Sequence, residues 1–171
     1  MMMGRFKNIL LAKLFTRFPK LIGRAFAKVS PVNVVGIPWA PFQKPLNESI
    51  IAIVTTAGVH LKDQPLFDMK DPDGDPSFRE LPSATPSHDY KITHDYYDHA
   101  DADRDLNIVF PVGRLMEMER AGVIKAAAKV NYGFMGHITG RHVDTLIKKS
   151  APEVAARLKK ENADAVLLTP G

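Results

Sequence analysis

Apolar residues recur every three or four positions along residues 5–29, with lysine and arginine mostly between them. This spacing predicts an amphipathic helix within residues 1–30, kinked or broken at Pro19, whose ring removes a backbone hydrogen-bond donor. Two uses of this basic helix are open. It can dock on a membrane surface or a partner subunit, or it can pack across the protein's own core. We favour packing on the core or on a partner over contact with lipid.

The next segment is rich in proline. Four prolines fall within residues 30–45, around the only tryptophan, Trp39. Proline donates no backbone hydrogen bond and restricts the residue before it, so this run excludes a helix. We therefore expect an extended linker over residues 31–48.

From residue 49 onward the pattern is typical of an α/β protein. Residues 49–56 form an unbroken apolar and β-branched run, which predicts a strand buried on both faces, as parallel sheets require. Residues 107–110 form a second such run. Residues 114–121 then predict a helix that stops at Gly122.

Four further elements follow: a weaker strand over residues 123–128, a helix from Thr139 towards Lys149, a helix ending near Glu161 and a buried strand over residues 164–168. Ser150 and Glu153 have the spacing of a capping box at the start of the second helix. The strand–helix–strand order predicts a doubly wound α/β domain with a mostly parallel sheet over residues 49–171. Because no helix follows the last strand to cover it, we expect this domain to be incomplete.

The composition excludes several kinds of chemistry. The 171 residues contain no cysteine, so they hold no disulfide, thiolate zinc site, iron–sulfur ligand or cysteine nucleophile. No apolar run reaches the roughly 18 residues that a membrane-spanning helix needs. The apolar stretch near the N-terminus is too short for a secretory signal. We expect a cytoplasmic protein.

Charge is distributed unevenly along the chain. The net charge is +4, and residues 1–47 hold eight lysines and arginines but no acid. Twelve of the 19 acids lie between residues 63 and 105. An acidic region of this size repels phosphate, so we expect no nucleic-acid partner.

Familiar binding loops are absent. The sequence has no phosphate-binding or dinucleotide-binding glycine loop and no nucleophile elbow. Residues 71–75 resemble the start of a calcium loop, but the twelfth position from Asp71 is Pro82, where a bidentate glutamate is required. We reject a calcium site there.

The densest polar cluster covers residues 93–105. If it is helical, His94 shares a face with Asp98, and Asp95 shares a face with His99. Such histidine–carboxylate pairs suit acid–base chemistry or a divalent metal. The alternative is a solvated loop whose aspartates cap turns. We favour the loop over a metal site, and contact with a substrate stays open.

Two more histidines follow glycines closely. His60 lies just after the first predicted strand, and His137 lies just before a predicted helix. Ligands of open α/β sheets bind beyond the carboxyl ends of the strands. We therefore predict that His60, His94, His99 and His137 approach the end of the last strand. Together with Asp95 and Asp98 they form the predicted substrate site.

Several separate motifs, in matching order over about residues 38–171, are familiar. They are TTAGVHLKDQ at 55–64, FRE at 78–80, ITHDYYDH at 92–99, NIVFP at 107–111, FMGH at 134–137, SAPEV at 150–154 and DAVLLTPG at 164–171. With them the sequence closely resembles the N-terminal part of the selenoprotein B family. These proteins are the substrate-specific components of the glycine, sarcosine, betaine and D-proline reductases of anaerobic bacteria. Leu66, Asn131 and Gly133 depart from the family's pattern.

The resemblance implies an oxidoreductase that cleaves a carbon–nitrogen bond reductively. The family's reactive residue is a selenocysteine, or a cysteine in some members, directly after the segment matched by residues 164–171. The resemblance also implies partners: a small amino-acid-type substrate, a subunit that bears a pyruvoyl group, and thiol or selenol carrier proteins. No cofactor is expected in this chain itself.

Selenocysteine is encoded by UGA, which gene-calling usually reads as a stop. We therefore expect a UGA codon after the codon for Gly171, and a chain that is inactive as written. The alternative function is a non-catalytic docking protein that uses the basic helix within residues 1–30.

Overall fold

The computed structural model describes residues 2–18 and 40–171. These residues divide into two compact units, one that contains residues 2–18, 40–43 and 95–98, and the other residues 44–94 and 99–171. The Pro19 break and Trp39 lie outside the described residues.

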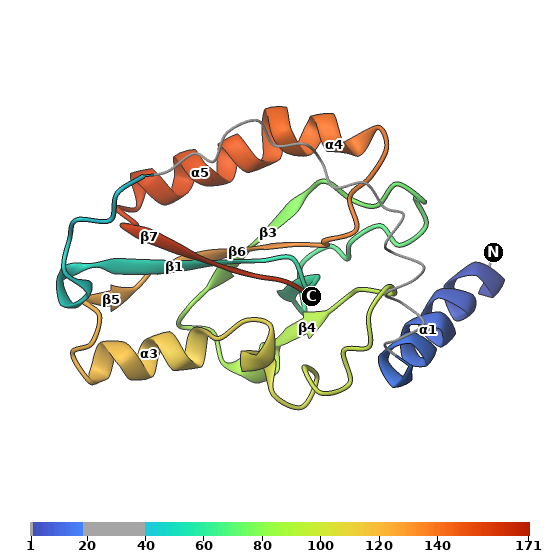
Figure 1. Cartoon of the computed structure of the whole chain (residues 1–171), viewed down its shortest axis with the longest axis horizontal. Coiled ribbons are helices and arrows are strands. Elements are labelled where there is room, and N and C mark those ends of the chain that lie inside the picture. Colours follow the sequence, from blue (N-terminus) through green and yellow to red (C-terminus); the bar gives the residue numbers. More distant parts are fainter. Residues whose placement is uncertain (1, 19–39) are drawn as a thin grey trace. The chain divides into compact units, whose positions relative to one another are not determined.

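The first unit contains helix α1, Met2–Arg17 (Figure 1). It confirms the N-terminal half of the helix predicted within residues 1–30. Several apolar side chains of this segment are exposed, among them Leu10, Leu14 and Phe18.

The second unit is built on a mostly parallel sheet, as predicted. Its strands are β1 (Ile50–Thr55), β3 (Phe78–Pro82), β5 (Ala126–Ala127), β6 (Val130–Phe134) and β7 (Ala165–Thr169). Strand β1 is central: it pairs in parallel with β7 along one edge and with β5 and then β6 along the other. Strand β3 pairs antiparallel with β6 at the far edge. A second, two-stranded antiparallel sheet joins β2 (Val59–Leu61) to β4 (Tyr90–Ile92).

Helices lie on both sides of the main sheet (Figure 1). Helix α3 (Val112–Arg120) covers one face, and α4 (His142–Thr145) and α5 (Ala151–Lys160) cover the other. Three short 3-10 turns complete the unit: η1 (Leu46–Glu48), η2 (Ser87–Asp89) and η3 (Leu106–Ile108).

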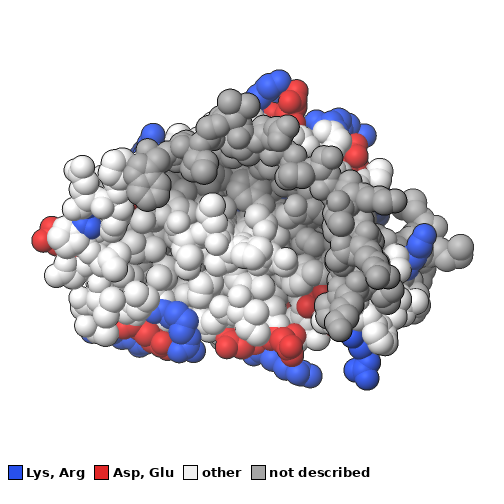
Figure 2. Space-filling model, viewed as in Figure 1, with Lys and Arg blue, Asp and Glu red and all other residues white. Residues whose placement is uncertain are grey.

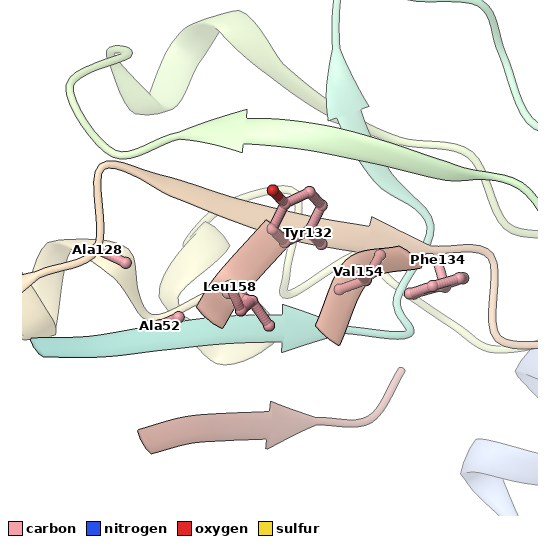
Figure 3. Close-up of a cluster of buried hydrophobic side chains, with 6 residues drawn as sticks. All are labelled: Ala52, Ala128, Tyr132, Phe134, Val154 and Leu158. Atoms are coloured by element: carbon pink, nitrogen blue, oxygen red, sulfur yellow. The ribbon is translucent and has the colours of Figure 1, made fainter. Parts of the chain in front are cut away.

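A compact core joins α5 to the sheet. Val154 and Leu158, one turn apart on α5, point towards the sheet residues Ala52, Tyr132 and Phe134 (Figure 3). On the other face of β1, the alternate residues Ile51 and Ile53 are buried. Strand β1 is thus buried on both faces, as its unbroken apolar run predicts.

The predicted strand at residues 107–110 is wrong. Residues 106–108 form the turn η3, because the carboxylate of Asp105 accepts hydrogen bonds from the backbone N–H and the side-chain amide of Asn107. Local hydrogen bonds from a side chain to the backbone compete with the backbone hydrogen bonds that a strand needs. Val109 and Phe110 are nevertheless buried, whereas Ile108 is 59% exposed, so only the second half of the apolar run contributes to the core.

The predicted capping box at Ser150 is also wrong. Ser150 has helical dihedral angles and makes no capping hydrogen bond, because α4 continues through a π-helical turn, Leu146–Ser150, directly into α5. Pro152 has no amide hydrogen to donate to the preceding turn, and a widened π-turn accommodates it. The weak strand predicted at residues 123–128 reduces to the two residues of β5.

Strand β7 forms where predicted, but it is not buried. Leu168 is 72% exposed, and Val166 and Leu167 are about 40% exposed. In the described chain β7 pairs with β1 alone, so it is an edge strand of the sheet. Figure 2 shows that the surface around β7 is uncharged, with charged side chains along its rim.

Candidate functional site

The carboxyl ends of three parallel strands meet at one edge of the main sheet. Thr55 of β1 is in register with Gly133 of β6 and with Thr169 of β7. Beyond the strands, the Thr56 N–H donates to the Thr169 carbonyl (2.9 Å) and the Gly58 N–H donates to the Phe134 carbonyl (2.8 Å). This edge is where open α/β sheets bind their ligands.

Two threonine hydroxyls fix the strand ends to the segment beneath them. Thr55 Oγ1 and Thr169 Oγ1 both donate to the carbonyl of Val109, at 2.8 and 2.7 Å. The carbonyl of the buried Val109 therefore joins the ends of β1 and β7. The sequence gives no periodic signal for this contact.

Two glycines allow the loops at this edge to approach each other closely. Gly136 has a φ of +89°, and a Cβ there would lie 2.2 Å from the Thr56 carbonyl oxygen. Gly58 has a φ of +74°, and a Cβ there would lie 2.4 Å from the Thr93 carbonyl oxygen. Neither position can hold a side chain without movement of the backbone.

The predicted residues His60 and His94 lie beside this edge. The Thr93 N–H donates to the Gly58 carbonyl (2.9 Å), which places His94 next to the loop after β1. His94 is 8% exposed and follows β4.

His60 lies in β2 and is fully buried. Its Nδ1 lies 2.7 Å from the Leu61 carbonyl, which can only accept, so Nδ1 carries the hydrogen. Its Nε2 then accepts from the Thr93 hydroxyl at 2.8 Å. Burial lowers the pKa of His60, so the ring is neutral near pH 7. These contacts tie β2 to the segment after β4, and a substrate contact of His60 stays a prediction.

His137, also predicted, lies in the loop between β6 and α4. Its Nε2 donates to the Pro72 carbonyl at 3.1 Å. The Thr139 N–H donates to the Asp73 carbonyl, and Gly74 forms a bridge with Ile138. The loop of residues 71–75 therefore crosses the loop that carries His137.

A cluster of charged residues fastens these two loops, and the sequence analysis missed it. Asp71 Oδ2 accepts from Arg141 and from His142 Nε2, the latter at 2.9 Å. The hydrogen bond from His142 holds the pKa of Asp71 below its usual value. The sequence signals were the aspartates of residues 71–75 and the basic pair after Gly140, but they lie about 70 residues apart along the chain.

Residues 93–99 are not helical, so the condition under which His94 would share a helix face with Asp98, and Asp95 with His99, is not met. His99 Nδ1 lies 2.8 Å from Asp103 Oδ2. Asp95 and Asp98 belong to the first unit, whereas the other four predicted site residues belong to the second. Among the described residues, no group of three histidines and acids is placed to hold a metal ion.

Of the six predicted site residues, His60, His94 and His137 come from segments that contact the loops at the strand ends, whereas His99 lies in a separate hollow beside β4. No helix within residues 2–18 and 40–171 has the length and apolar character needed to cross a membrane. The strand ends thus combine the buried Thr55, the partly buried Thr169 and two closely packed glycines, Gly58 and Gly136.

Comparison with known proteins gives several relatives. Over 133 residues the chain is 39% identical to the D-proline reductase subunit gamma of Acetoanaerobium sticklandii, which covers 78% of this chain and 53% of the relative. It is 31% identical over 164 residues to the glycine reductase complex component B subunit gamma of Symbiobacterium thermophilum, covering 88% of this chain and 35% of that relative. It is 29% identical over 135 residues to the betaine reductase complex component B subunit beta of Peptoclostridium acidaminophilum, covering 74% and 29%.

The chain thus spans between about half and less than a third of the length of these relatives. No solved structure matches it significantly. The family model for glycine/sarcosine/betaine reductase selenoprotein B matches residues 17–171, which include both sheets of the second unit and the whole strand-end edge. The chain therefore belongs to the glycine/sarcosine/betaine reductase selenoprotein B family.

Proposed function

We propose that this chain supplies the N-terminal part of a substrate-specific reductase component, which acts in the reductive cleavage of a carbon–nitrogen bond in glycine, sarcosine, betaine or D-proline. The family match over residues 17–171 carries the proposal. The structure supports it through the strand-end edge, where Thr55, Gly133 and Thr169 lie in register.

The redox-active residue lies outside the 171 residues in this proposal, since they contain no cysteine. The selenocysteine implied by the family would follow β7 at the strand-end edge. A selenol there would supply the electrons for cleavage. The hydrogen bonds that join Thr169 to Val109 and to Thr56 support this position.

The proposal also includes partner subunits. The relatives are named as subunits or components of reductase complexes, which supports assembly with other chains. We propose that these partners include a subunit with a pyruvoyl group, which holds the substrate amine, and thiol or selenol carriers. Because the redox-active residue lies outside these 171 residues in this proposal, the chain alone is expected to give no product from glycine, betaine or D-proline with dithiothreitol as reductant.

A chimera tests the function. Residues 38–171 of this chain would replace the matching segment of the D-proline reductase subunit gamma, and the complex would be assayed with D-proline, glycine, sarcosine and betaine. We expect reduction of at least one of the four. A chimera that assembles with its partner subunits but reduces none of them would refute the proposal. The parent complex and a Gly136→Val chimera, whose loop cannot close, are the positive and negative controls.

A second candidate function is docking through the basic helix. Leu10, Leu14 and Phe18 are exposed in a segment that holds lysines and arginines but no acid. The test is light scattering with anionic vesicles, with and without residues 1–30. Salt-sensitive binding that the deletion abolishes would support docking.

A further inference from the structure

Strand β7 is exposed on both of its faces. Leu167, which is in register with the fully buried Ile53, is 42% exposed. Leu168, on the opposite face of the sheet, is 72% exposed. Strands of a parallel sheet are normally buried on both faces. The described residues therefore cover β7 only in part.

The backbone of β7 shows which of its sides is open. Successive residues of a strand direct their N–H and C=O groups to opposite sides. The Thr169 carbonyl accepts the Thr56 N–H at 2.9 Å, so Thr169 and, two residues earlier, Leu167 direct these groups towards β1. Val166 and Leu168 direct theirs away from β1, and no strand of the described chain pairs with β7 on that side.

The open edge lacks the features that stop an edge strand from pairing. Such edges are normally protected by a charge, a proline, a bulge or a covering segment. Strand β7 reads Ala-Val-Leu-Leu-Thr, and the surface around it is uncharged (Figure 2). At the other edge of the sheet, β3 carries Arg79, Glu80 and Pro82. This contrast fits a sheet in which β3 is an edge and β7 is an interior strand.

The length of the relatives indicates what covers β7. The match covers only 53% of the D-proline reductase subunit gamma and 35% of the glycine reductase component, so close to half of the first and about two thirds of the second lie outside it. A segment of the same chain is present at a high effective concentration, about millimolar for a short linker, whereas a second copy must bind from solution. A strand of the same polypeptide is therefore favoured over a second copy.

We propose that the open side of β7 is the docking surface for a further strand of the same polypeptide, from the part of the family chain that lies outside these 171 residues. The backbone groups of Val166 and Leu168 bond to that strand, and the segment joined to it covers the Leu168 side chain. One end of such a strand lies beside Thr169, so the added part of the chain reaches the strand-end edge. This inference rests on the proposed function, in which the chain is the N-terminal part of a longer component.

Amide hydrogen exchange tests the pairing without any substitution in β7. The 171-residue chain, diluted until sedimentation shows a monomer, is compared with the chimera that carries residues 38–171. In the chain alone, the Val166 and Leu168 amides should exchange at least about a hundredfold faster than the Leu167 amide, which points to β1. In the chimera without partner subunits, this ratio should fall below about ten, because all three amides are then paired.

A photoactivatable leucine analogue identifies the covering segment. At position 168 of the chimera, we expect it to cross-link to residues of the same chain outside the matched segment. Position 66 is the matched control. Leu66 is 65% exposed, but its carbonyl accepts a hydrogen bond from Arg79 of β3 at the other edge of the sheet, so no such cross-link is expected. Mixed isotope labels distinguish the same chain from a second copy.

Three results would overturn the inference: a difference in exchange that persists in the chimera, protection that requires the partner subunits, or a cross-link from position 168 to a partner or to a second copy. The assay of the chimera separates this inference from the proposed function. A chimera that reduces one of the four substrates while β7 stays open would overturn the inference alone. A chimera with a protected β7 that reduces none would support the inference and refute the function.

Discussion

A single buried asparagine supplies a missing hydrogen-bond partner in the main sheet at the point where the register of β1 changes. Strand β1 pairs with Ala126 and Ala127 at its start but with Tyr132 and Gly133 at its end, a shift of two residues. In the gap, Asn131 Oδ1 accepts the Ile53 N–H at 2.7 Å. Its amide also donates to Ser83 Oγ at 2.8 Å and to the Leu81 carbonyl. Asn131 thus joins β1 to β3 across β6.

Replacement of this asparagine by leucine should be costly. Asn131→Leu leaves the Ile53 N–H buried without an acceptor, so we expect the free energy of unfolding to fall by about 2–4 kcal/mol. Urea denaturation measures the change. Asn47→Leu is the control, because Asn47 is exposed, and its effect should stay within about 0.5 kcal/mol. A similar effect of the two substitutions would contradict this role of Asn131.

The buried histidine His60 predicts a dependence of stability on pH. Burial lowers its pKa in the folded protein, so the unfolded chain binds more protons at this site when the pH falls below about 6.5. Stability should therefore decrease from pH 7 to pH 5, by at most about 1.4 kcal/mol per pH unit from this residue.

The measurement is the slope of the unfolding free energy against pH. His60→Gln should flatten the slope, whereas His88→Gln, at an exposed side chain, should leave it unchanged. Equal slopes in the two variants would mean that His60 does not control this pH dependence.

At the scale of elements, the sequence predicted a strand correctly where the pattern of apolar residues matches the backbone conformation. Strand β1 was predicted because its apolar run is unbroken. Helix α5 was also predicted, but from a capping box at Ser150 that does not form. Strand β6 was missed because it reads Val-Asn-Tyr-Gly-Phe. The side chain of Asn131 accepts a hydrogen bond from β1, and Gly133 lies against the Val59 carbonyl. Both residues are required by these contacts, although asparagine and glycine are uncommon in strands.

Part of the candidate site was likewise predicted from the sequence, and part of it was missed. The glycines before His60 and His137 indicated loops at the strand ends, and both loops are there. The cluster of Asp71, Arg141 and His142 depends on a contact between two loops about 70 residues apart, and no local pattern encodes such a contact. The helix face considered for residues 94–99 is wrong because those residues do not form a helix.

The close contact between the strand-end loops predicts that two glycine substitutions differ in their cost to the free energy of unfolding. Gly136 and Gly122 both have positive φ, +89° and +70°, but only Gly136 lies against backbone. Gly122→Ala should cost about 1–2 kcal/mol for its left-handed conformation alone. Gly136→Ala should cost at least about 2 kcal/mol more, because its Cβ would lie 2.2 Å from the Thr56 carbonyl oxygen. Thermal or urea unfolding of both variants measures the difference, and equal costs would show that the two loops can separate freely.

At the scale of the whole second unit, the two edges of the main sheet differ. At one edge, antiparallel β3 carries Arg79 and Glu80, and Glu80 pairs with Arg157 of α5. At the other edge, β7 presents Val166, Leu167 and Leu168 to solvent beside the central strand. The charged edge discourages pairing with another chain, whereas an exposed apolar edge strand favours it. The uncharged surface in Figure 2 therefore predicts self-association of this chain.

Sedimentation velocity over a range of protein concentrations tests this prediction. The unmodified chain should form larger species as the concentration rises, and Leu168→Lys should shift it towards the monomer. The stability should change little, since Leu168 is 72% exposed. Ile147→Lys is the matched control: Ile147 is 58% exposed, but it lies in the helical segment and not at a sheet edge, so this change should leave the association intact. Lysine at position 168 acts because a charge on an edge strand must be desolvated when a second strand pairs with it. A chain that stays monomeric at every concentration, or two lysine variants that associate alike, would show that the β7 edge does not drive the association.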